Sequence, residues 1–373
     1  MARINLSTSI TLNQLADAVA AVGTQRTIIA RGEPGIGKSA TLATLGKRFP
    51  THKTVYIDCQ LLLDQGDFFY PFIEVTEGGG KVAKRVPLED FEFSDGVPLI
   101  VNLDEIGKAN KAVLNVLLTL IYDHRIGNRY LPAGSMVFAT TNLASDGVGD
   151  FVAAHARSRV ILTNIKKPHA GFNHDGTVDA DSWGYWALGN GIAPELLAWV
   201  KSNQHCLDSY VDYDGKEKWS NPYPFHPTQG GESYVCPRSL HAASDVIKQR
   251  ATLGADLTLS LLAGTCGESF ARDISAFFVV KDRLTSVEAI VAAPDTAPVP
   301  EAGDAVAQCV MVFNLVTATK PETVTAFVKY MERTPKEYQA LYARSTMAND
   351  TKQPVVVACE AFRKWAMNNQ WMF

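Results

Sequence analysis

Eight consecutive residues near the N-terminus combine glycines, a lysine and a serine in a spacing that suits phosphate binding. They read GEPGIGKS, which is Gly32, Glu33, Pro34, Gly35, Ile36, Gly37, Lys38 and Ser39, and Ala40 follows them. The glycines let successive backbone N–H groups point into one concavity, and the helix that follows adds positive potential there. In this P-loop pattern the lysine reaches the β- and γ-phosphates and the serine hydroxyl ligates Mg²⁺. The stretch therefore predicts a nucleotide phosphate site.

A second group of chemically active side chains ends an apolar run later in the chain. Residues 99–105 read LIVNLDE, which predicts a buried strand that ends in Asp104 and Glu105. Ligands of open α/β folds lie at the carboxyl ends of the strands. We expect Asp104 to hold the Mg²⁺ shell and Glu105 to polarise the attacking water. Such a pair is otherwise a solvated strand terminus, but the preceding P-loop favours the functional interpretation.

Two more stretches bring single polar side chains toward the same edge. Residues 136–142 read MVFATTN, and Asn142 is expected to orient the water, although an asparagine that closes a strand is often only a turn former. Residues 155–160 read HARSRV and carry Arg157 and Arg159. Either is a candidate arginine finger, which would stabilise the charge on a neighbouring subunit's γ-phosphate. We favour Arg159, and the alternative is that both are ordinary surface arginines.

Apolar runs and helical periods predict the elements that must position these residues. Strands are expected at 26–30, 54–58, 97–103, 136–141 and 160–162, and helices at 11–23, after the glycine loop as far as 49, and at 110–122. Alternating strands and helices imply a parallel sheet covered on both faces, so residues 1–165 are predicted to form an α/β core. The aperiodic stretch 60–96, with hairpin-like pieces, is interpreted as an insertion.

The rest of the chain divides by composition into three predicted parts. Residues 166–235 are rich in aromatic side chains and form a connecting segment, and 236–300 return to helical patterns as a lid. The Pro- and Ala-rich stretch 291–301 is an expected boundary, after which 301–373 form a C-terminal helical extension. The aromatic residues are expected to pack between core and lid rather than to stack bases, because no Lys- or Arg-rich groove accompanies them.

Composition excludes several classes of protein. The 373 residues are 46% hydrophobic and 20% charged, which is the range of a folded globular chain, and the net charge is −4. That charge gives no global field toward nucleic acid or anionic membrane. No uninterrupted apolar run is long enough for a membrane span, and the N-terminus lacks a signal-peptide pattern, so we expect a cytoplasmic protein. Six dispersed cysteines predict reduced thiols, and no metal-binding cluster is expected around His169, His174 or His205.

Taken together, the motifs resemble those of AAA+ ATPases, and more narrowly those of the MoxR and dynein-related group. The resemblance rests on GEPGIGKS, on LIVNLDEIGKANKAVLNVLL, on MVFATTN as sensor 1 and on ARSRV as the arginine-finger stretch. It implies that 60–96 is the extra hairpin that such proteins carry in the second core helix. It also implies that VCPRSL, residues 235–240, opens the lid as sensor 2, with Arg238 sensing phosphate. The alternative is that Arg238 is only a basic residue in the first turn of a helix.

The same resemblance implies a Mg²⁺-dependent ATP hydrolase that assembles as a homo-oligomeric ring, most simply a hexamer, and remodels a protein substrate or adaptor in the manner of a chaperone. The usual companion of such proteins contains a von Willebrand factor A domain. One alternative is a nucleic-acid motor or a nucleotide-gated DNA-processing subunit, which the net charge disfavours. Another is a small-molecule kinase, which Glu105 and Asn142 disfavour because both suit the placement of water. A small basic patch at Lys81, Lys84 and Arg85 is interpreted as a solvated hairpin.

Overall fold

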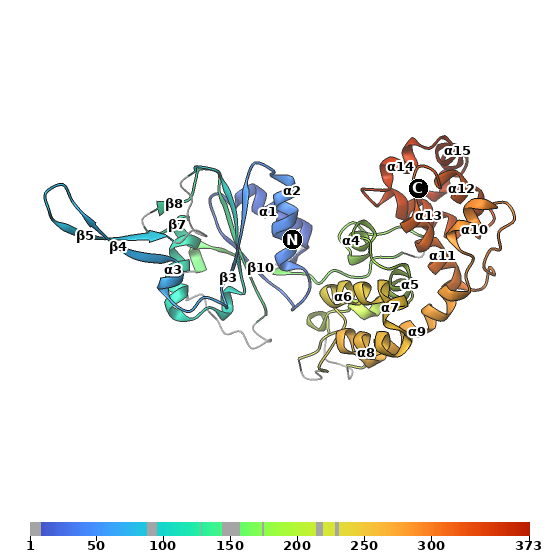
Figure 1. Ribbon diagram of the computed structural model, residues 1–373, viewed down its shortest axis with the longest axis horizontal. Coiled ribbons are helices and arrows are strands. Elements are labelled where there is room, and N and C mark those ends of the chain that lie inside the picture. Colours follow the sequence, from blue (N-terminus) through green and yellow to red (C-terminus); the bar gives the residue numbers. More distant parts are fainter. Residues whose placement is uncertain are drawn as a thin grey trace, which may run out of the picture. The chain divides into compact units, whose positions relative to one another are not determined.

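The computed structural model describes residues 9–87, 95–127, 129–143, 157–173, 175–213, 219–227 and 231–373 (Figure 1). The chain divides into two compact units, Met1–Lys167 and Pro168–Phe373. The first unit contains the parallel sheet, and the regular secondary structure in the described part of the second consists of helices, with loops and two isolated bridges between them. This arrangement confirms the predicted α/β fold with helices after it.

Six parallel strands form the sheet of the first unit, in the order β1-β10-β2-β9-β6-β3. Their bounds are Ser9–Ile10 (β1), Ile28–Arg31 (β2), Lys53–Asp58 (β3), Leu99–Asp104 (β6), Met136–Thr141 (β9) and Ile161–Ile165 (β10). Every predicted strand is present within a few residues, and β1 is an addition. Because β2, β9 and β6 are neighbours, their carboxyl ends bring the three main motifs to one edge.

Helices cover both faces of this sheet. α1 (Leu12–Val22) and α2 (Thr41–Arg48) share a hydrophobic cluster with one face, and α3 (Lys111–Asp123) shares a second cluster with the other. A capping box begins α1, since the Thr11 hydroxyl accepts from the Gln14 backbone N–H and the Gln14 side chain accepts from the Thr11 backbone N–H. Short 3-10 turns at Lys38–Ala40 and Ile106–Lys108 follow the two main motifs.

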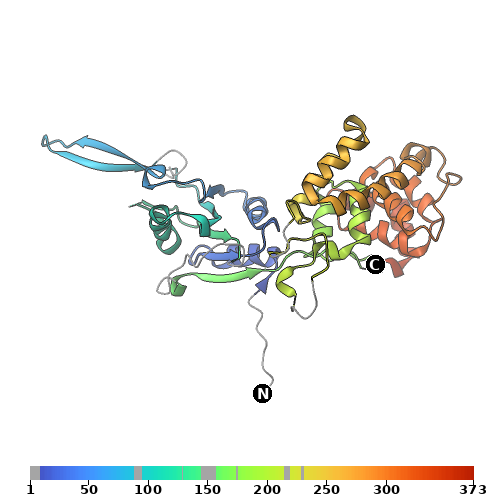
Figure 2. The same cartoon turned by 90° about the horizontal axis from the view of Figure 1, so that it is seen from below.

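The stretch predicted as an insertion contains a long antiparallel hairpin. β4 (Phe69–Val75) pairs with β5 (Lys81–Pro87), and the hairpin projects from the body of the first unit (Figures 1 and 2). Apolar side chains remain exposed on it, among them Phe72 at 54% and Ile73 at 63%. A second, shorter hairpin joins β7 (Arg125–Ile126) and β8 (Arg129–Tyr130).

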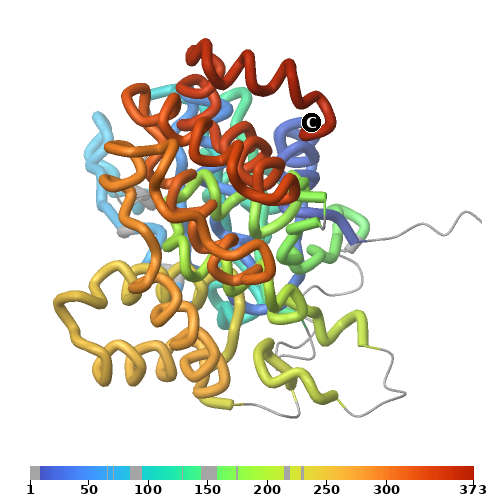
Figure 3. Tube along the Cα trace, turned by 90° about the vertical axis from the view of Figure 1, so that its right-hand side faces the viewer, coloured from blue at the N-terminus to red at the C-terminus, as the bar shows by residue number. Residues whose placement is uncertain are grey.

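The second unit is built from twelve helices among its described residues. They are α4 (Trp183–Gly189), α5 (Pro194–Ser202), α6 (Pro237–Lys248), α7 (Arg250–Leu253), α8 (Ala255–Cys266), α9 (Glu268–Arg283), α10 (Val287–Ala292), α11 (Ala305–Ala318), α12 (Val324–Met331), α13 (Lys336–Met347), α14 (Gln353–Ala358) and α15 (Glu360–Asn368). Figure 3 follows them from green through orange to red. Throughout the described part of the chain, the helices fall short of the length and apolarity that crossing a membrane requires.

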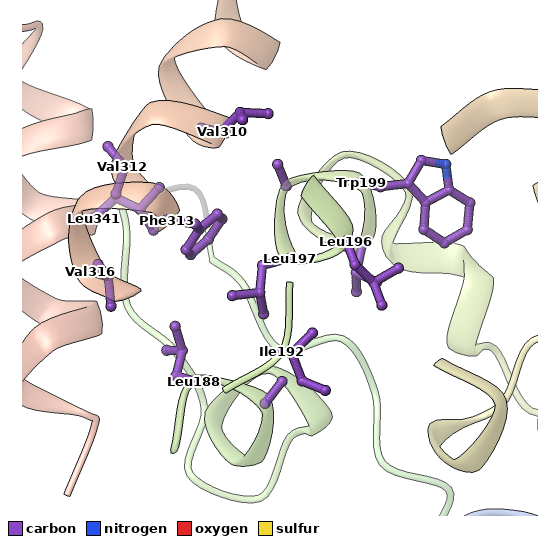
Figure 4. Packing of buried hydrophobic residues seen from close by; sticks show 14 of the residues in the cluster. Leu188, Ile192, Leu196, Leu197, Trp199, Val310, Val312, Phe313, Val316 and Leu341 are labelled. Carbon is purple, nitrogen blue, oxygen red and sulfur yellow. The ribbon is translucent and has the colours of Figure 1, made fainter. Parts of the chain in front are cut away.

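One hydrophobic cluster fills the second unit. α5 packs against α11, and their side chains, including Leu197 and Phe313, meet in the interior shown in Figure 4. Trp183 and Trp199 are almost fully buried there. Helices on both sides of the Pro- and Ala-rich stretch 291–301 belong to this cluster. The division of the second unit into connecting segment, lid and extension stays a prediction.

Candidate nucleotide-binding site

The glycine-rich loop between β2 and α2 has the backbone shape that a phosphate cradle needs. Gly35 and Gly37 have φ angles of +73° and +104°, a region that side chains with a Cβ rarely adopt. The chain then enters the 3-10 turn Lys38–Ala40 and continues directly into α2. The start of a helix carries positive potential, which favours binding of an anion there.

The buried amine of Lys38 joins this loop to the end of β9. Its Nζ donates to the carbonyl oxygens of Gly32 at 2.9 Å and Glu33 at 2.8 Å, and to Asn142 Oδ1 at 2.9 Å. Lys38 is only 6% exposed, so these acceptors replace the water that an ammonium group otherwise binds. The structure therefore brings the predicted sensor asparagine next to the P-loop lysine.

The Asp104 carboxylate at the end of β6 lies beside the hydroxyl of Ser39. Ser39 Oγ donates to Asp104 Oδ2 at 2.7 Å, Tyr56 OH donates to the same oxygen at 2.8 Å, and the Thr140 hydroxyl donates to Oδ1. Burial by itself would raise the pKa of Asp104, but the hydrogen bonds from Thr140, Ser39 and Tyr56 outweigh it and hold that pKa below its usual value. Asp104 is therefore ionised, and with Ser39 it offers the hard oxygen ligands that Mg²⁺ prefers.

Glu105 follows Asp104 in an uncommon backbone conformation. Its φ of +51° is left-handed, which for a residue with a Cβ costs about 1–3 kcal/mol and persists only when the surroundings impose it. Asn142 Nδ2 donates to both carboxylate oxygens, at 3.0 and 3.2 Å, and Lys108 Nζ lies 3.4 Å from Oε2. The amide of Asn142 thus bridges Lys38 and Glu105, so the loop lysine and the second carboxylate are positioned by one side chain.

Glu33, the second residue of the loop motif, forms a buried ion pair with Lys167 after β10. The Lys167 Nζ lies 3.5 Å from Glu33 Oε2, and the side chains are 1% and 4% exposed, respectively. Removing one partner of such a pair leaves an uncompensated charge and typically costs about 3–5 kcal/mol. The pair therefore ties the phosphate loop to the end of β10, the last strand of the sheet.

Sequence reasoning missed three side chains of this site: Tyr56, Thr140 and Lys167. Thr140 stands two residues before Asn142 within the motif MVFATTN, so its position on the same face of β9 was a usable signal. Tyr56 and Lys167 gave no such signal. Their partners are fixed by the pairing of β3 with β6 and by the position of β10 beside β2.

The predicted arginines belong to a 3-10 turn of the first unit and to a helix of the second. Arg159 is exposed in the 3-10 turn Arg157–Arg159, with its guanidinium carbon 5.2 Å from the centre of the Tyr122 ring. Residues 155 and 156 of the predicted finger stretch, and the Arg157 side chain, lie outside what the structure describes. Arg238 belongs to the second unit, where it is exposed in the first turn of α6. The roles of Arg159 and Arg238 stay predictions.

The histidines singled out for weak metal signals form no cluster among the described residues. His169 Nε2 lies 3.2 Å from an oxygen of Asp179, and His174 lies outside the described residues. Within the ranges that the structure describes, no group of three or more His, Cys, Asp or Glu side chains is arranged to hold a metal ion.

Comparison with protein families identifies the segment that carries the site. Residues 27–159 match the AAA domain of the dynein-related subfamily, a range that includes the P-loop, Asp104, Glu105 and Asn142. This family binds nucleotides, as the loop geometry indicates. No curated protein matches the chain.

Solved structures give weaker likenesses. The chain is similar to a putative ATPase from Cytophaga hutchinsonii at 16% identity, which covers 43% of this chain and 48% of that one, with a TM-score of 0.28. It is similar to NtrX from Brucella abortus in complex with ADP at 13% identity over 98% and 69% of the chains, with a TM-score of 0.38. The RuvB Holliday junction branch migration motor of Thermotoga maritima is 14% identical over 96% and 86%, with a TM-score of 0.31. The chain spans about half the length of the Cytophaga protein, and these low scores support no functional argument.

Proposed function

We propose that this chain, whose residues 27–159 match the AAA domain of the dynein-related subfamily, couples Mg²⁺-dependent ATP hydrolysis to remodelling of a protein partner from within a ring-shaped oligomer. One observation carries the hydrolytic part of this proposal. Asn142 joins Lys38 of the loop to Glu105, next to the Ser39 and Asp104 pair. Groups suited to phosphate, metal and water thus share one edge of the sheet.

The proposed roles follow from the chemistry of each side chain. Backbone N–H groups of the loop residues 35–39 bind the phosphates, and Lys38 neutralises their charge once its amine turns from the loop carbonyls toward them. Ser39 and Asp104 would hold Mg²⁺, which supplies charge neutralisation at the β- and γ-phosphate oxygens. Glu105 accepts a proton from the attacking water, and Asn142 holds the carboxylate in place for that step.

The ring is supported by the family and by the exposure of Arg159. In the structure Arg159 packs on Tyr122, which leaves its guanidinium at the surface of the unit. An exposed arginine of one subunit is suited to complete the site of the next, where it would stabilise the charge of the transferring phosphoryl group. We propose a hexamer in the cytoplasm, with Arg238 as the sensor of the lid and a protein partner such as a von Willebrand factor A domain protein.

The alternative of a nucleic-acid motor has less support. The hairpin β4–β5 carries Lys81 and Lys84, but Lys84 is ion-paired with Glu74, which compensates its charge. With a net charge of −4, the chain offers no strong attraction for a phosphate backbone.

The proposal is tested by measuring phosphate release per subunit as a function of protein concentration, in ATP and Mg²⁺. A shared site predicts a specific activity that rises steeply and then reaches a plateau, with sizing of the same samples showing assembly over that range. A constant specific activity in samples that remain monomeric would contradict the ring.

The finger is tested separately by mixing subunits. Arg159→Ala should bind ATP normally and lose turnover, because it lacks the arginine that it gives to its neighbour. Adding Lys38→Ala subunits, which keep Arg159 but cannot bind ATP, should restore part of the turnover. If Arg159→Ala retains full activity alone, Arg159 is not the finger.

A further inference from the structure

The second unit contains an aromatic pocket, and none of the residues that line it is among those described above for the nucleotide site. Its volume is about 390 Å³, within the range of ligand pockets, and residues of the stretch 219–234 line it. This stretch is yellow-green in Figure 3. The aromatic lining residues, which we call the pocket aromatics, are Trp219, Tyr223, Phe225, His226 and Tyr234.

The floor of the pocket is fixed to the helical core. The Tyr223 ring lies edge-to-face against Trp199 of α5, with centroids 5.3 Å apart, and Trp199 in turn packs on Phe270 of α9 at 4.7 Å. The backbone N–H of Val235 donates to the Tyr223 carbonyl at 2.7 Å. Because Trp199 and Phe270 are fully buried, the floor is as rigid as the core itself.

The walls are aromatic rings that contact one another but stay partly exposed. Trp219 lies over His226 at 5.1 Å with an interplanar angle of 31°, and Tyr213 meets Trp219 edge-on at 5.4 Å. Phe225 contacts Tyr234 at 5.1 Å. Aromatic faces carry negative electrostatic potential, so several of them around one cavity attract a cation.

Carboxylates stand directly behind this lining. Asn221, which lines the pocket, donates from Nδ2 to Asp208 Oδ2 at 3.3 Å, and Tyr223 OH donates to Asp273. Burial and Asp273 together raise the pKa of Tyr223 to about 12, so the phenol stays neutral at physiological pH.

Two more acidic residues, Asp212 and Glu232, belong to the same part of the chain. Over the whole of 202–234 the sequence has five acidic residues against two lysines, Lys216 and Lys218. The surroundings of the pocket are therefore acidic, and a cation bound there would gain attraction from carboxylates as well as from the rings.

These observations favour a cationic ligand over a nucleic acid or a neutral apolar ligand. A platform for nucleic acid needs an excess of lysines or arginines to bind phosphates, and in this stretch acidic residues outnumber the lysines. A neutral apolar ligand would gain nothing from the acidic surroundings. Of the cationic side chains, arginine is the one whose planar group stacks on aromatic rings.

We propose that the aromatic pocket binds an arginine side chain presented by a partner protein. The guanidinium stacks on the ring of Trp219, and Asp208 attracts its charge. This inference concerns recognition of a partner and does not depend on the proposed hydrolysis.

The test uses the full chain and a fluorescein-labelled peptide of alternating arginine and alanine, followed by anisotropy at low salt. A peptide with citrulline at each arginine keeps the shape and hydrogen-bonding groups but removes the charge. We expect the citrulline peptide to bind at least about tenfold more weakly, and a lysine peptide to fall between them. Absence of binding by the arginine peptide, or equal binding of the arginine and citrulline peptides, would overturn the proposal.

Variants then place the binding in the pocket. Trp219→Ala should weaken binding of the arginine peptide at least about fivefold, whereas Trp219→Phe, which keeps a ring, should lose much less. The matched control is Trp371→Ala, since Trp371 is a 43% exposed indole outside the pocket with Lys336 over its ring. Equal effects of the two alanine variants would place the binding elsewhere. Binding of labelled oligothymidine that Trp219→Ala abolishes would replace the proposal with base stacking.

Discussion

The sheet edge of the first unit and the aromatic pocket of the second are assembled in different ways. At the sheet edge, the P-loop, β3, β6 and β9 each contribute side chains, and hydrogen bonds between them hold each one in place. The pocket is lined by residues 219–226, 231, 233 and 234, which are close in sequence, and its Tyr223 packs on Trp199 of the helical core. The geometry of the first site therefore depends on correct pairing of several strands. The geometry of the pocket depends mainly on how its own residues pack against the helical core.

The largest expected effect comes from removing the charge of Glu105 at the sheet edge. Glu105→Gln keeps the shape and a hydrogen bond with Asn142 but cannot accept a proton, so we expect kcat to fall about 10²–10⁴-fold while ATP still binds. Phosphate release and binding of a fluorescent ATP analogue measure the two effects. Glu322→Gln, an exposed change in the second unit, is the matched control. Near-normal turnover of Glu105→Gln would remove Glu105 from its proposed role.

The floor of the pocket should tolerate change poorly, without effect on nucleotide binding. Trp199 is fully buried, and Trp199→Ala should lower the free energy of unfolding of the second unit by about 3–5 kcal/mol. Thermal or denaturant unfolding, followed separately from ATP binding, measures this loss. If ATP binding falls in step with stability, the two units do not unfold independently and the contrast between their sites fails.

The smallest effect is expected at Tyr56, which adjusts Asp104 without being needed for its placement. Tyr56→Phe removes one of the three side-chain hydrogen bonds that, with a backbone hydrogen bond from Glu105, lower the pKa of Asp104, so that pKa should rise toward its usual value. The ionised form is then lost at a higher pH, and the acid limb of the turnover profile should move upward. At neutral pH we expect less than about a fivefold change in kcat. An unchanged acid limb would show that Tyr56 does not influence Asp104.

The pH dependence of the free energy of unfolding should change in the corresponding direction. The lowered pKa of Asp104 stabilises the folded chain above the pKa that this carboxyl has when unfolded, and this contribution is lost as the pH falls through the folded value. Tyr56→Phe should therefore reduce the difference in stability between neutral and acid pH, as unfolding in urea at each pH would show.

Local patterns were sufficient for the parts of the site that lie within one segment. The P-loop can be recognised from its glycines and Lys38 alone. The strands β6 and β9 are apolar runs, and the polar residues at their ends are visible in the sequence. The contacts between segments were harder to predict from the sequence. Strand pairing aligns Asp58 with Asp104, and this register brings Tyr56 close enough to reach the Asp104 carboxylate. The sequence KTVYID does not by itself indicate which strand pairs with it.

The second unit shows the same limit. Its helical patterns were predicted from their periods, but the contacts of the Pro- and Ala-rich stretch 291–301 were not, and residues on both sides of it share one hydrophobic cluster. The stretch is held by contacts from later helices, since Tyr330 OH donates to the Pro298 carbonyl at 2.8 Å and Arg333 Nη1 to the Ala297 carbonyl at 2.8 Å. Composition describes the flexibility of an isolated segment, and here the neighbouring helices determine its conformation.

At Glu105 the requirements of catalysis and of stability differ, because the proposed chemistry needs a carboxylate and the left-handed backbone favours glycine. Glycine adopts this conformation without steric cost, so Glu105→Gly would relieve the local strain while it removes the carboxylate. Selection for a robust fold alone would therefore favour an inert chain at this position. A library of variants selected only for thermal stability would then be expected to accumulate glycine or asparagine at this position and to lose ATPase activity.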